Sequence, residues 1–182
     1  LIRPLRVVLP LYMEEMHFVV AADSPLKYID EIRGKKIYMG PEGSGAALAT
    51  TTLYGLMFDG ERPNRVDASA DHKQALNSLL DRDGKVDVVV FVAGQPISQL
   101  TVEAELGRKH YRLLAARPEH ASMKKTLDVY YPTEISKQSY AWLAANVPTL
   151  SVKAYLITYD YPQEFNRTAI AGFARSLCSN YD

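Results

Sequence analysis

A short glycine- and serine-rich loop, residues 40–46, has residue types that could hold a ligand. It lies in the stretch KKIYMGPEGSGAALATTTLYGLMF, residues 35–58, between an apolar strand-like run and a long segment without a breaker until Gly55. A Gly-Ser-Gly turn at the start of a helix directs backbone N–H groups to one point, and the helix dipole adds partial positive charge there. The loop could bind a phosphate, support attack on an acyl group, or capture a carboxylate without chemistry.

The phosphate alternative lacks the residues that nucleotide loops use. A P-loop requires Gly-x-x-x-x-Gly-Lys-Ser/Thr, whereas Gly40 and Gly45 are followed here by Ala46 and Ala47. The dinucleotide pattern Gly-x-G-x-x-Gly is also absent, because the glycines stand at positions 40, 43 and 45. The sequence therefore indicates neither nucleotide hydrolysis nor dinucleotide binding.

If the chain were a hydrolase, Ser44 would be the candidate nucleophile. The motif Gly-x-Ser-x-Gly needs glycine at positions 42 and 46, where the chain has Glu42 and Ala46. The histidines stand at positions 17, 72, 110 and 120 without a local motif, although a distant one could approach Ser44 in the fold. The simplest alternative is that Ser44 only caps the helix while Gly43 and Gly45 form the turn.

Composition narrows the class of protein. The chain has 182 residues, 47% of them apolar, which suffices for one sizeable domain or two small ones. Lys plus Arg and Asp plus Glu both number 21, so the basic surplus of a nucleic-acid-binding surface is missing. The longest apolar run, VVVFVA at 88–93, is far shorter than the about 20 residues of a membrane span. We therefore expect no nucleic-acid partner and no membrane insertion by this segment, and its single Cys178 excludes an internal disulfide.

Strand-like and helix-like segments alternate along the chain. Apolar runs predict strands over 16–23, 36–40, 65–71, 85–94, 111–117 and 150–160. Helical spacing and start signals predict helices over 44–58, 72–84, 95–107, 118–127 and 162–177, with an irregular aromatic segment over 130–148. This alternation predicts an α/β domain with a mostly parallel sheet flanked by helices. The 40–44 loop would then follow the carboxyl end of a strand, an edge that ligands favour in open sheets.

Three blocks of the sequence resemble the TAXI family, which comprises extracytoplasmic solute receptors of TRAP transporters with the type 2 periplasmic-binding-protein fold. ADSPLKYIDEIRGKKIYMGPEGSGAALAT is similar to the family segment that opens the second lobe. KVDVVVFVAGQPISQL resembles a later strand and loop of the family, and EISKQSYAWLAANVPTLSVKAYLITYDYP resembles the stretch that returns to the first lobe. The blocks occur in family order and span roughly residues 5 to 175.

The resemblance implies a periplasmic-binding-protein type 2-like architecture, a second lobe plus crossing strands. Residues 1–23 would be a remnant of the first lobe with the first crossing strand, and 24–149 the ligand-binding second lobe. Residues 150–182 would be the second crossing strand and a first-lobe helix. A full family member has more sequence than this chain, so the resemblance also implies that this piece alone binds weakly or not at all.

The resemblance assigns ligand-binding roles to nine residues. Gly43, Ser44 and Gly45 match the cradle for a carboxylate, while Ala46 replaces the usual threonine and keeps only its backbone N–H. The other matched or neighbouring positions are Gly94, Gln95 and Pro96, in a loop facing the cleft, and Arg6 and Tyr12, in the wall of the first lobe. Gln95 could offer its amide to a polar ligand, whereas Arg6 is equally well a solvated charge and Tyr12 a packed aromatic.

The function implied by the resemblance is solute capture without catalysis, metal or cofactor. A small carboxylate, an amino acid such as glutamate or an organic acid, would bind in the periplasm or another extracytoplasmic space, and the closed form would be read by membrane transporter subunits. The alternatives are a ligand-sensing module of a signalling protein, an enzyme that uses Ser44, and a domain that keeps the fold without binding.

Overall fold

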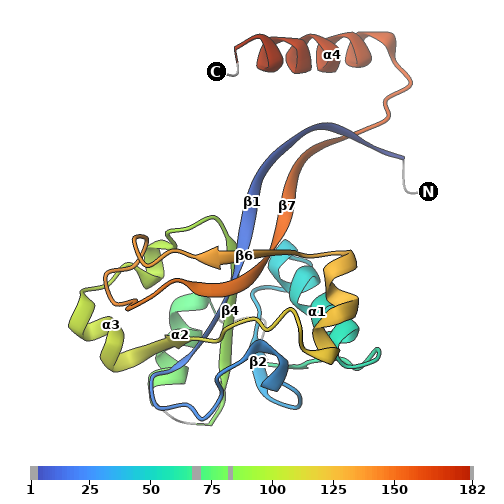
Figure 1. The fold of residues 1–182 in the computed structure, drawn as a ribbon. Coiled ribbons are helices and arrows are strands. Elements are labelled where there is room, and N and C mark those ends of the chain that lie inside the picture. The colour runs from blue at the N-terminus through green and yellow to red at the C-terminus, as the bar shows by residue number, and fades with distance from the viewer. Residues whose placement is uncertain (1–3, 67–70, 82–83, 181–182) are drawn as a thin grey trace. The chain divides into compact units, whose positions relative to one another are not determined.

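The computed structural model describes residues 4–66, 71–81 and 84–180. Its helices and strands alternate along most of the chain (Figure 1). In order, the elements are β1 (Leu5–Ala21), η1 (Ile29–Glu31), β2 (Lys36–Tyr38), α1 (Gly45–Met57), β3 (Asn64–Arg65), α2 (His72–Asp81), β4 (Val88–Ala93), η2 (Ser98–Leu100), α3 (Ala104–His110), β5 (Tyr111–Leu113), η3 (Ala121–Asp128), β6 (Tyr131–Ile135), β7 (Val147–Tyr159) and α4 (Glu164–Ser179), where η marks a 3-10 helix.

The chain divides into two compact units. The larger unit is Glu14–Val152, and the smaller one combines Leu1–Met13 with Lys153–Asp182. Both β1 and β7 contribute residues to both units, because each strand continues across the boundary between them. The assignment of these parts to a first and a second lobe stays a prediction.

The sheet of the larger unit is mixed, so the expected mostly parallel sheet is wrong in this detail while the α/β class is confirmed. The strand order is β3-β2-β4-β1-β7-β6, with β5 also beside β1. Pairing is parallel between β2 and its neighbours β3 and β4, and antiparallel for β1 with β4, β1 with β5, and β6 with β7. Strand direction depends on the connection. The helices α1 and α2 are crossovers between parallel strands, whereas only the short η1 lies between β1 and β2, and β1 runs opposite to the parallel strands.

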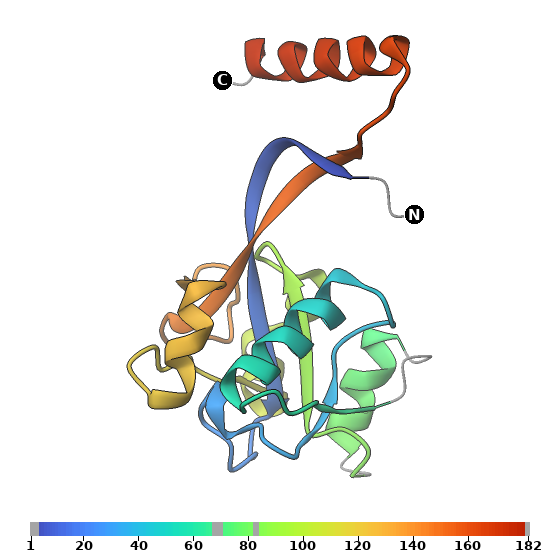
Figure 2. The same cartoon turned by 90° about the vertical axis from the view of Figure 1, so that its right-hand side faces the viewer.

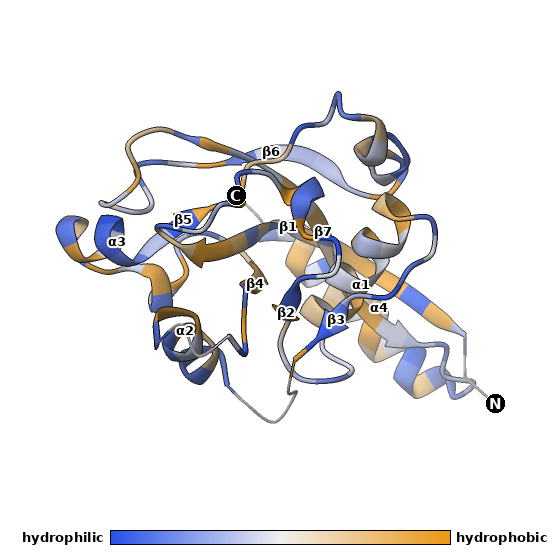
Figure 3. Cartoon of the chain, turned by 90° about the horizontal axis from the view of Figure 1, so that it is seen from below, coloured by the Kyte–Doolittle hydropathy of each residue, from blue (hydrophilic) through white to orange (hydrophobic). Residues whose placement is uncertain are grey.

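Two buried clusters cover the two faces of this sheet. Successive residues of a strand point to opposite faces, so β1 and β4 contribute to both clusters. The α1 side contains Met16, Phe18, Val88 and Val90 with Leu53 and Met57 of the helix. The α2 side contains Val19, Val89 and Phe91 with Ala75, Leu76 and Leu79 of the helix. Figure 2 shows these two helices beside β4, and Figure 3 shows β4 in the hydrophobic colour.

The segment predicted as one helix over 95–107 is instead a loop, the short η2 and then α3. Its backbone groups bond to aromatic side chains rather than to a helix ladder: Ile97 N–H donates to the Tyr140 hydroxyl at 2.8 Å, and Leu100 C=O accepts from the Trp142 indole at 2.8 Å. Long-range bonds of this kind satisfy buried backbone groups as well as a helix does.

Two other element predictions are also corrected. The segment expected as a helix over 118–127 forms the 3-10 helix η3, and the segment expected to be irregular over 130–148 contains β6 and the start of β7. Parts of the predicted strand over 65–71 and helix over 72–84, residues 67–70 and 82–83, lie outside the described residues.

Candidate functional site

One edge of the sheet in the larger unit gathers most of the residues that the sequence singles out. The parallel strands β2 and β4 end at this edge, so the loop over 39–44 and the loop over 94–97 both leave from it. Because β1 runs antiparallel to β4, with Glu15 opposite Ala93, the segment of β1 around Glu15 lies at the same edge. The structure thus places Gly43–Ala46 and Gly94–Pro96 at a common edge.

The start of α1 presents two backbone donors. Ser44 is the N-cap, with φ −70° and ψ 155°, and its Oγ accepts a hydrogen bond from Ala47 N–H at 3.1 Å. The turn before it depends on Gly43, whose φ of 77° favours glycine. The N–H groups of Gly45 and Ala46 have no hydrogen-bond partner among the described residues, as expected for the first turn of a helix. These two groups can receive a negatively charged atom.

The Ser44 hydroxyl is used within the turn. Besides accepting from Ala47, it donates to Pro41 C=O at 2.8 Å. His72 does lie against this loop, since a Cβ built on Gly40 would be 3.6 Å from His72 Cε1 and 3.3 Å from Ser44 Oγ. However, His72 Nε2 is buried without a hydrogen-bond partner, so it is not bonded to Ser44. This geometry is that of a helix cap and leaves Ser44 without a hydrogen-bonded base.

A guanidinium group adds positive charge beside the same loop. Arg65 Nη2 donates to Gly40 C=O at 2.8 Å, and Arg65 Nε is buried without a hydrogen-bond partner. Within residues 4–66, 71–81 and 84–180, no carboxylate forms an ion pair with Arg65. A cation next to a helix N-terminus favours an anionic guest.

The second loop at this edge uses its polar groups internally. Gln95 Nε2 donates to Glu134 C=O at 3.1 Å, and Gln95 Oε1 accepts from Ser136 N–H at 2.7 Å and from Ser139 Oγ at 3.0 Å. The Gln95–Pro96 peptide is cis, and Gly94 and Pro96 are exposed. The Gln95 amide, expected to face a ligand, therefore holds the segment after β6.

A buried chain of hydrogen bonds connects β1 with the end of the loop over 94–97. His17 Nδ1 lies 3.1 Å from Glu15 C=O, and His17 Nε2 lies 2.9 Å from the Tyr140 hydroxyl, which also accepts from Ile97 N–H. A ring nitrogen facing a carbonyl must donate, so Nδ1 carries a proton, and in the neutral ring Nε2 accepts from the Tyr140 hydroxyl. Burial disfavours the charged ring and lowers the pKa of His17 to about 4, against the opposing effect of its bond to Glu15 C=O.

Two adjacent carboxylates at this edge were missed by the sequence reasoning. Glu15 Oε2 is buried and has no hydrogen-bond partner among the described residues. Burial raises the pKa of Glu14, and the neighbouring charge of Glu15 adds to this effect. The signal was present in MEEMHFVV, where two acidic residues interrupt an apolar strand and therefore resist burial unless something binds them.

The remaining two predicted residues, Arg6 and Tyr12, belong to the smaller unit. Arg6 forms an exposed ion pair with Asp160, with Nη2 2.7 Å from Oδ2. Tyr12 is 59% exposed. Their roles in ligand binding stay predictions.

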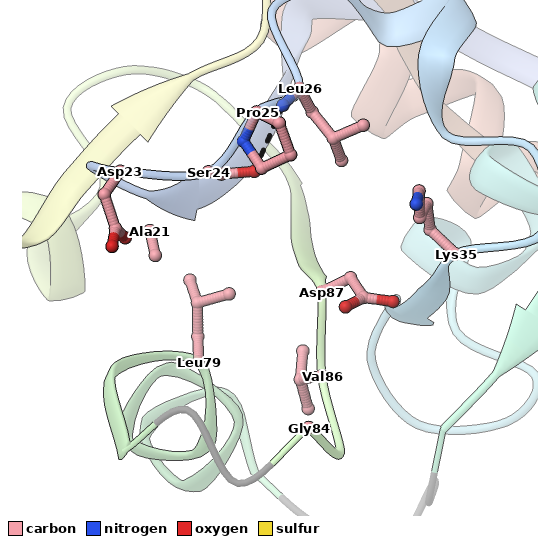
Figure 4. A pocket seen from close by; sticks show the side chains of 10 residues that line it. All are labelled: Ala21, Asp23, Ser24, Pro25, Leu26, Lys35, Leu79, Gly84, Val86 and Asp87. Carbon is pink, nitrogen blue, oxygen red and sulfur yellow. Dashed lines mark hydrogen bonds between the residues drawn. The ribbon is translucent and has the colours of Figure 1, made fainter.

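An open hollow of the larger unit lies at the opposite edge of the sheet, where β1 ends and β4 begins (Figure 4). Its volume is about 330 Å³, and its charged lining consists of Asp23, Lys35 and Asp87. Asp87 Oδ2 already accepts from Lys36 N–H at 2.8 Å and so holds the start of β2. None of the nine predicted residues lines this hollow.

Within the described part of the chain, no group of three His, Cys, Asp or Glu side chains is arranged to hold a metal ion. Among the same residues, no helix combines the length and apolar character that crossing a membrane requires.

The fold is similar to that of a solved periplasmic binding protein. A solved structure of an arginine transport system periplasmic binding protein from Legionella pneumophila matches 97% of this chain and 60% of that chain, at 14% identity and a TM-score of 0.52. A protein of glutathione import in Streptococcus mutans is 14% identical over 94% of this chain and 56% of that chain, with a TM-score of 0.48. A TctC solute binding protein from Polaromonas is 16% identical over 97% and 56% of the two chains, with a TM-score of 0.43.

The chain belongs to the NMT1-like family, whose sequence profile matches residues 2–168. It spans about three fifths of the length of the Legionella protein and less of the other two.

Proposed function

We propose that the chain is part of an extracytoplasmic solute receptor that captures a small carboxylate at the start of α1. The observation that carries this proposal is the pair of unpartnered N–H groups of Gly45 and Ala46 beside the guanidinium of Arg65, which has no ion-pair partner among the described residues. Hydrogen bonds to a carboxylate are charge-assisted and about twice as strong as neutral ones. No catalytic group is required for this role.

The finer assignments are part of the same proposal. Residues 24–149 act as the ligand-binding lobe, and β1 and β7 act as the crossing strands about which a receptor closes. The receptor belongs to the TAXI type, works in the periplasm or another extracytoplasmic space, and delivers its ligand to TRAP-type transporter subunits. Membership in the NMT1-like family and the fold of the Legionella protein support a binding role.

The proposal is tested by removing one donor while keeping the helix. In Gly45→Pro the N–H at the first helical position is lost, and proline is well tolerated there. Ser44 already has the extended conformation that a following proline requires. The matched control is Gly45→Ala, which keeps the N–H and whose Cβ meets no atom within 4 Å.

The measurement is titration calorimetry of the unmodified chain, called the parent, and of each variant, with a set of amino acids and dicarboxylates. We expect the parent to bind at least one of them and Gly45→Pro to weaken its binding by about tenfold or more. The control should stay within about threefold of the parent, a difference near 0.6 kcal/mol. Equal affinity of the proline variant and the control would contradict the proposal.

A further inference from the structure

A second open hollow of the larger unit lies between α2 and the strands β2 and β3, where β3 is the edge strand of the sheet (Figure 3). Its volume is about 490 Å³, within the range of about 300–1,000 Å³ that small-molecule sites have. None of the nine residues that the resemblance assigns to a ligand lines it. Among the described residues it shares Val86 alone with the hollow of Figure 4. This hollow is therefore separate from the candidate site at the start of α1.

The floor of this hollow is apolar. Alternate residues of a strand point to the same face of a sheet, so Lys36 and Tyr38 of β2 both lie on the α2 side. Helix α2 packs against β4 and buries Ala75 in the cluster on this side, and Val66 and Val86 lie partly buried against the same cluster. The part of this face nearest the edge strand is thus lined by hydrocarbon and by an aromatic ring.

The charge around this floor is positive. The charged side chains of the lining are Lys36 and Lys85, and no acidic side chain joins them among the described residues. Lys36 Nζ donates to Gly84 C=O at 2.6 Å and has no ion-pair partner within the described part of the chain. An ammonium carries three N–H donors, so two remain after this bond. The hollow of Figure 4 differs, because its lysine is accompanied by two carboxylates.

Neutral hydrogen-bond donors stand beside Lys36. Asn64 is its partner in the parallel pairing of β2 with β3, so both side chains lie on the same face of the sheet. Gln74 Oε1 accepts from Asp71 N–H at 3.1 Å, which holds the amide group at the start of α2. Its Nε2 has no hydrogen-bond partner among the described residues that would keep it from a guest. An anion with an apolar body would match both the floor and these donors.

We infer that this hollow is a second small-molecule site, which takes a small apolar carboxylate of about the size of octanoate or 3-phenylpropionate. The carboxylate binds Lys36 Nζ and the side-chain amides of Asn64 and Gln74, while the hydrocarbon body covers the apolar floor. The inference goes beyond the proposed function, because it concerns other residues on the α2 face of the sheet and requires no guest at the start of α1.

The test compares acids with alcohols that have the same hydrocarbon body. Calorimetric titrations of the parent use octanoate against 1-octanol, and 3-phenylpropionate against 3-phenyl-1-propanol. We expect the acid of at least one pair to bind about tenfold or more tightly than its alcohol. Lys36→Met keeps the apolar stem and removes the charge, so the acid and the alcohol should then bind within about threefold of each other.

The matched control is Lys73→Met in α2. Lys73 is exposed and lies outside the lining, so this variant loses the same charge and should keep the preference for the acid. Ser78→Leu is a second variant, which places a larger apolar side chain in the hollow from α2 and should weaken binding of the acid about tenfold or more. Melting temperatures check that each variant is folded.

Gly45→Pro locates the binding, since it changes the start of α1 and should leave the affinity for the acid as in the parent. The inference is overturned if neither acid binds, if acid and alcohol bind equally, or if Lys36→Met or Ser78→Leu binds the acid as the parent does. It is also overturned if Gly45→Pro abolishes binding, which would place the acid at α1 and support the proposed function instead. A preference that is lost with Lys36→Met and kept with Lys73→Met and Gly45→Pro supports the inference.

Discussion

The two loops that leave the carboxyl edge of the sheet differ in what they do with their polar groups. The loop before α1 leaves the N–H groups of Gly45 and Ala46 unpaired, beside the guanidinium of Arg65. The loop after β4 uses the Gln95 amide and Ile97 N–H in bonds to side chains and backbone from distant segments. The resemblance implies ligand contacts for both loops, and the two loops differ in how many of their polar groups are already bonded within the protein. Unpaired polar groups are the better guide to a binding surface.

The largest expected effect is on the second loop, where Tyr140→Phe lowers the free energy of unfolding. The substitution removes the hydroxyl that bonds both Ile97 N–H and His17 Nε2. Two buried groups would lose their partner at about 1–3 kcal/mol each, so we expect a loss of about 4 kcal/mol in the free energy of unfolding. Urea unfolding measures it. Tyr131→Phe, at a side chain that is 53% exposed, is the control and should change stability by less than about 0.5 kcal/mol. Equal urea midpoints for the two variants would show that the hydrogen bonds of the Tyr140 hydroxyl do not stabilise the loop over 94–97.

The next largest effect is a pH dependence that originates in His17. The pKa of His17 is about 4 in the folded chain and 6.5 when unperturbed, so the unfolded chain binds more protons between these values. Stability should therefore be level above pH 6.5 and fall by about 3 kcal/mol as the pH drops toward 4. Burial also lowers the pKa of His72, which adds to the slope in the same direction.

The comparison that isolates this contribution is urea unfolding of the parent and of His17→Gln between pH 4 and 8. The variant should be less stable at pH 7, because it loses the bond to Tyr140, and its stability should depend less on pH. An unchanged slope in His17→Gln would assign the pH dependence to other groups.

A smaller loss of stability should result from Gly107→Ala in α3, the helix that follows the second loop and η2. A Cβ at Gly107 would lie 2.2 Å from Trp142 Cγ and 2.4 Å from Trp142 Cβ, and Trp142 also binds Leu100 C=O in η2. The backbone or the indole must shift, which costs about 2 kcal/mol. Gly172→Ala in α4 is the control: its Cβ meets no atom within 4 Å, so thermal unfolding should show no loss. A stable Gly107→Ala would mean that α3 moves freely relative to Trp142.

The smallest expected effect concerns the first loop. Ser44→Ala removes the helix cap, at a cost of about 1 kcal/mol. Affinity for the carboxylate should change little, because the N–H groups of Gly45 and Ala46 remain, and Ser44→Asn should restore the lost stability. A loss of binding far larger than the loss of stability would show that the hydroxyl itself touches the ligand, contrary to its bonds to Pro41 and Ala47.

Local signals were sufficient for much of the fold. The strand predicted over 85–94 contains β4, and the helix predicted over 44–58 contains α1, whose N-cap is Ser44. These features depend on a few adjacent residues. The helix predicted over 95–107 failed because Tyr140, 43 positions after Ile97, takes over its backbone N–H.

The parts of the candidate site that the sequence did not reveal depend on contacts between distant segments. Gln95 was predicted to face a ligand, and only the position of Ser136 and Ser139 after β6 shows that its amide is occupied. Glu15 lies at this edge because β1 runs antiparallel to β4, a strand direction that the pattern of apolar residues does not encode.

The terminal helix α4 differs from every other long helix of the chain, because none of its residues from Glu164 to Ser179 is buried. A helix of 16 residues gains little stability on its own, since tertiary packing supplies most of it. Its amide hydrogens should therefore exchange with deuterium by local opening, whereas those of β4 should exchange only when the larger unit unfolds. In a deuterium-labelling time course, α4 would lose its protection first and β4 last.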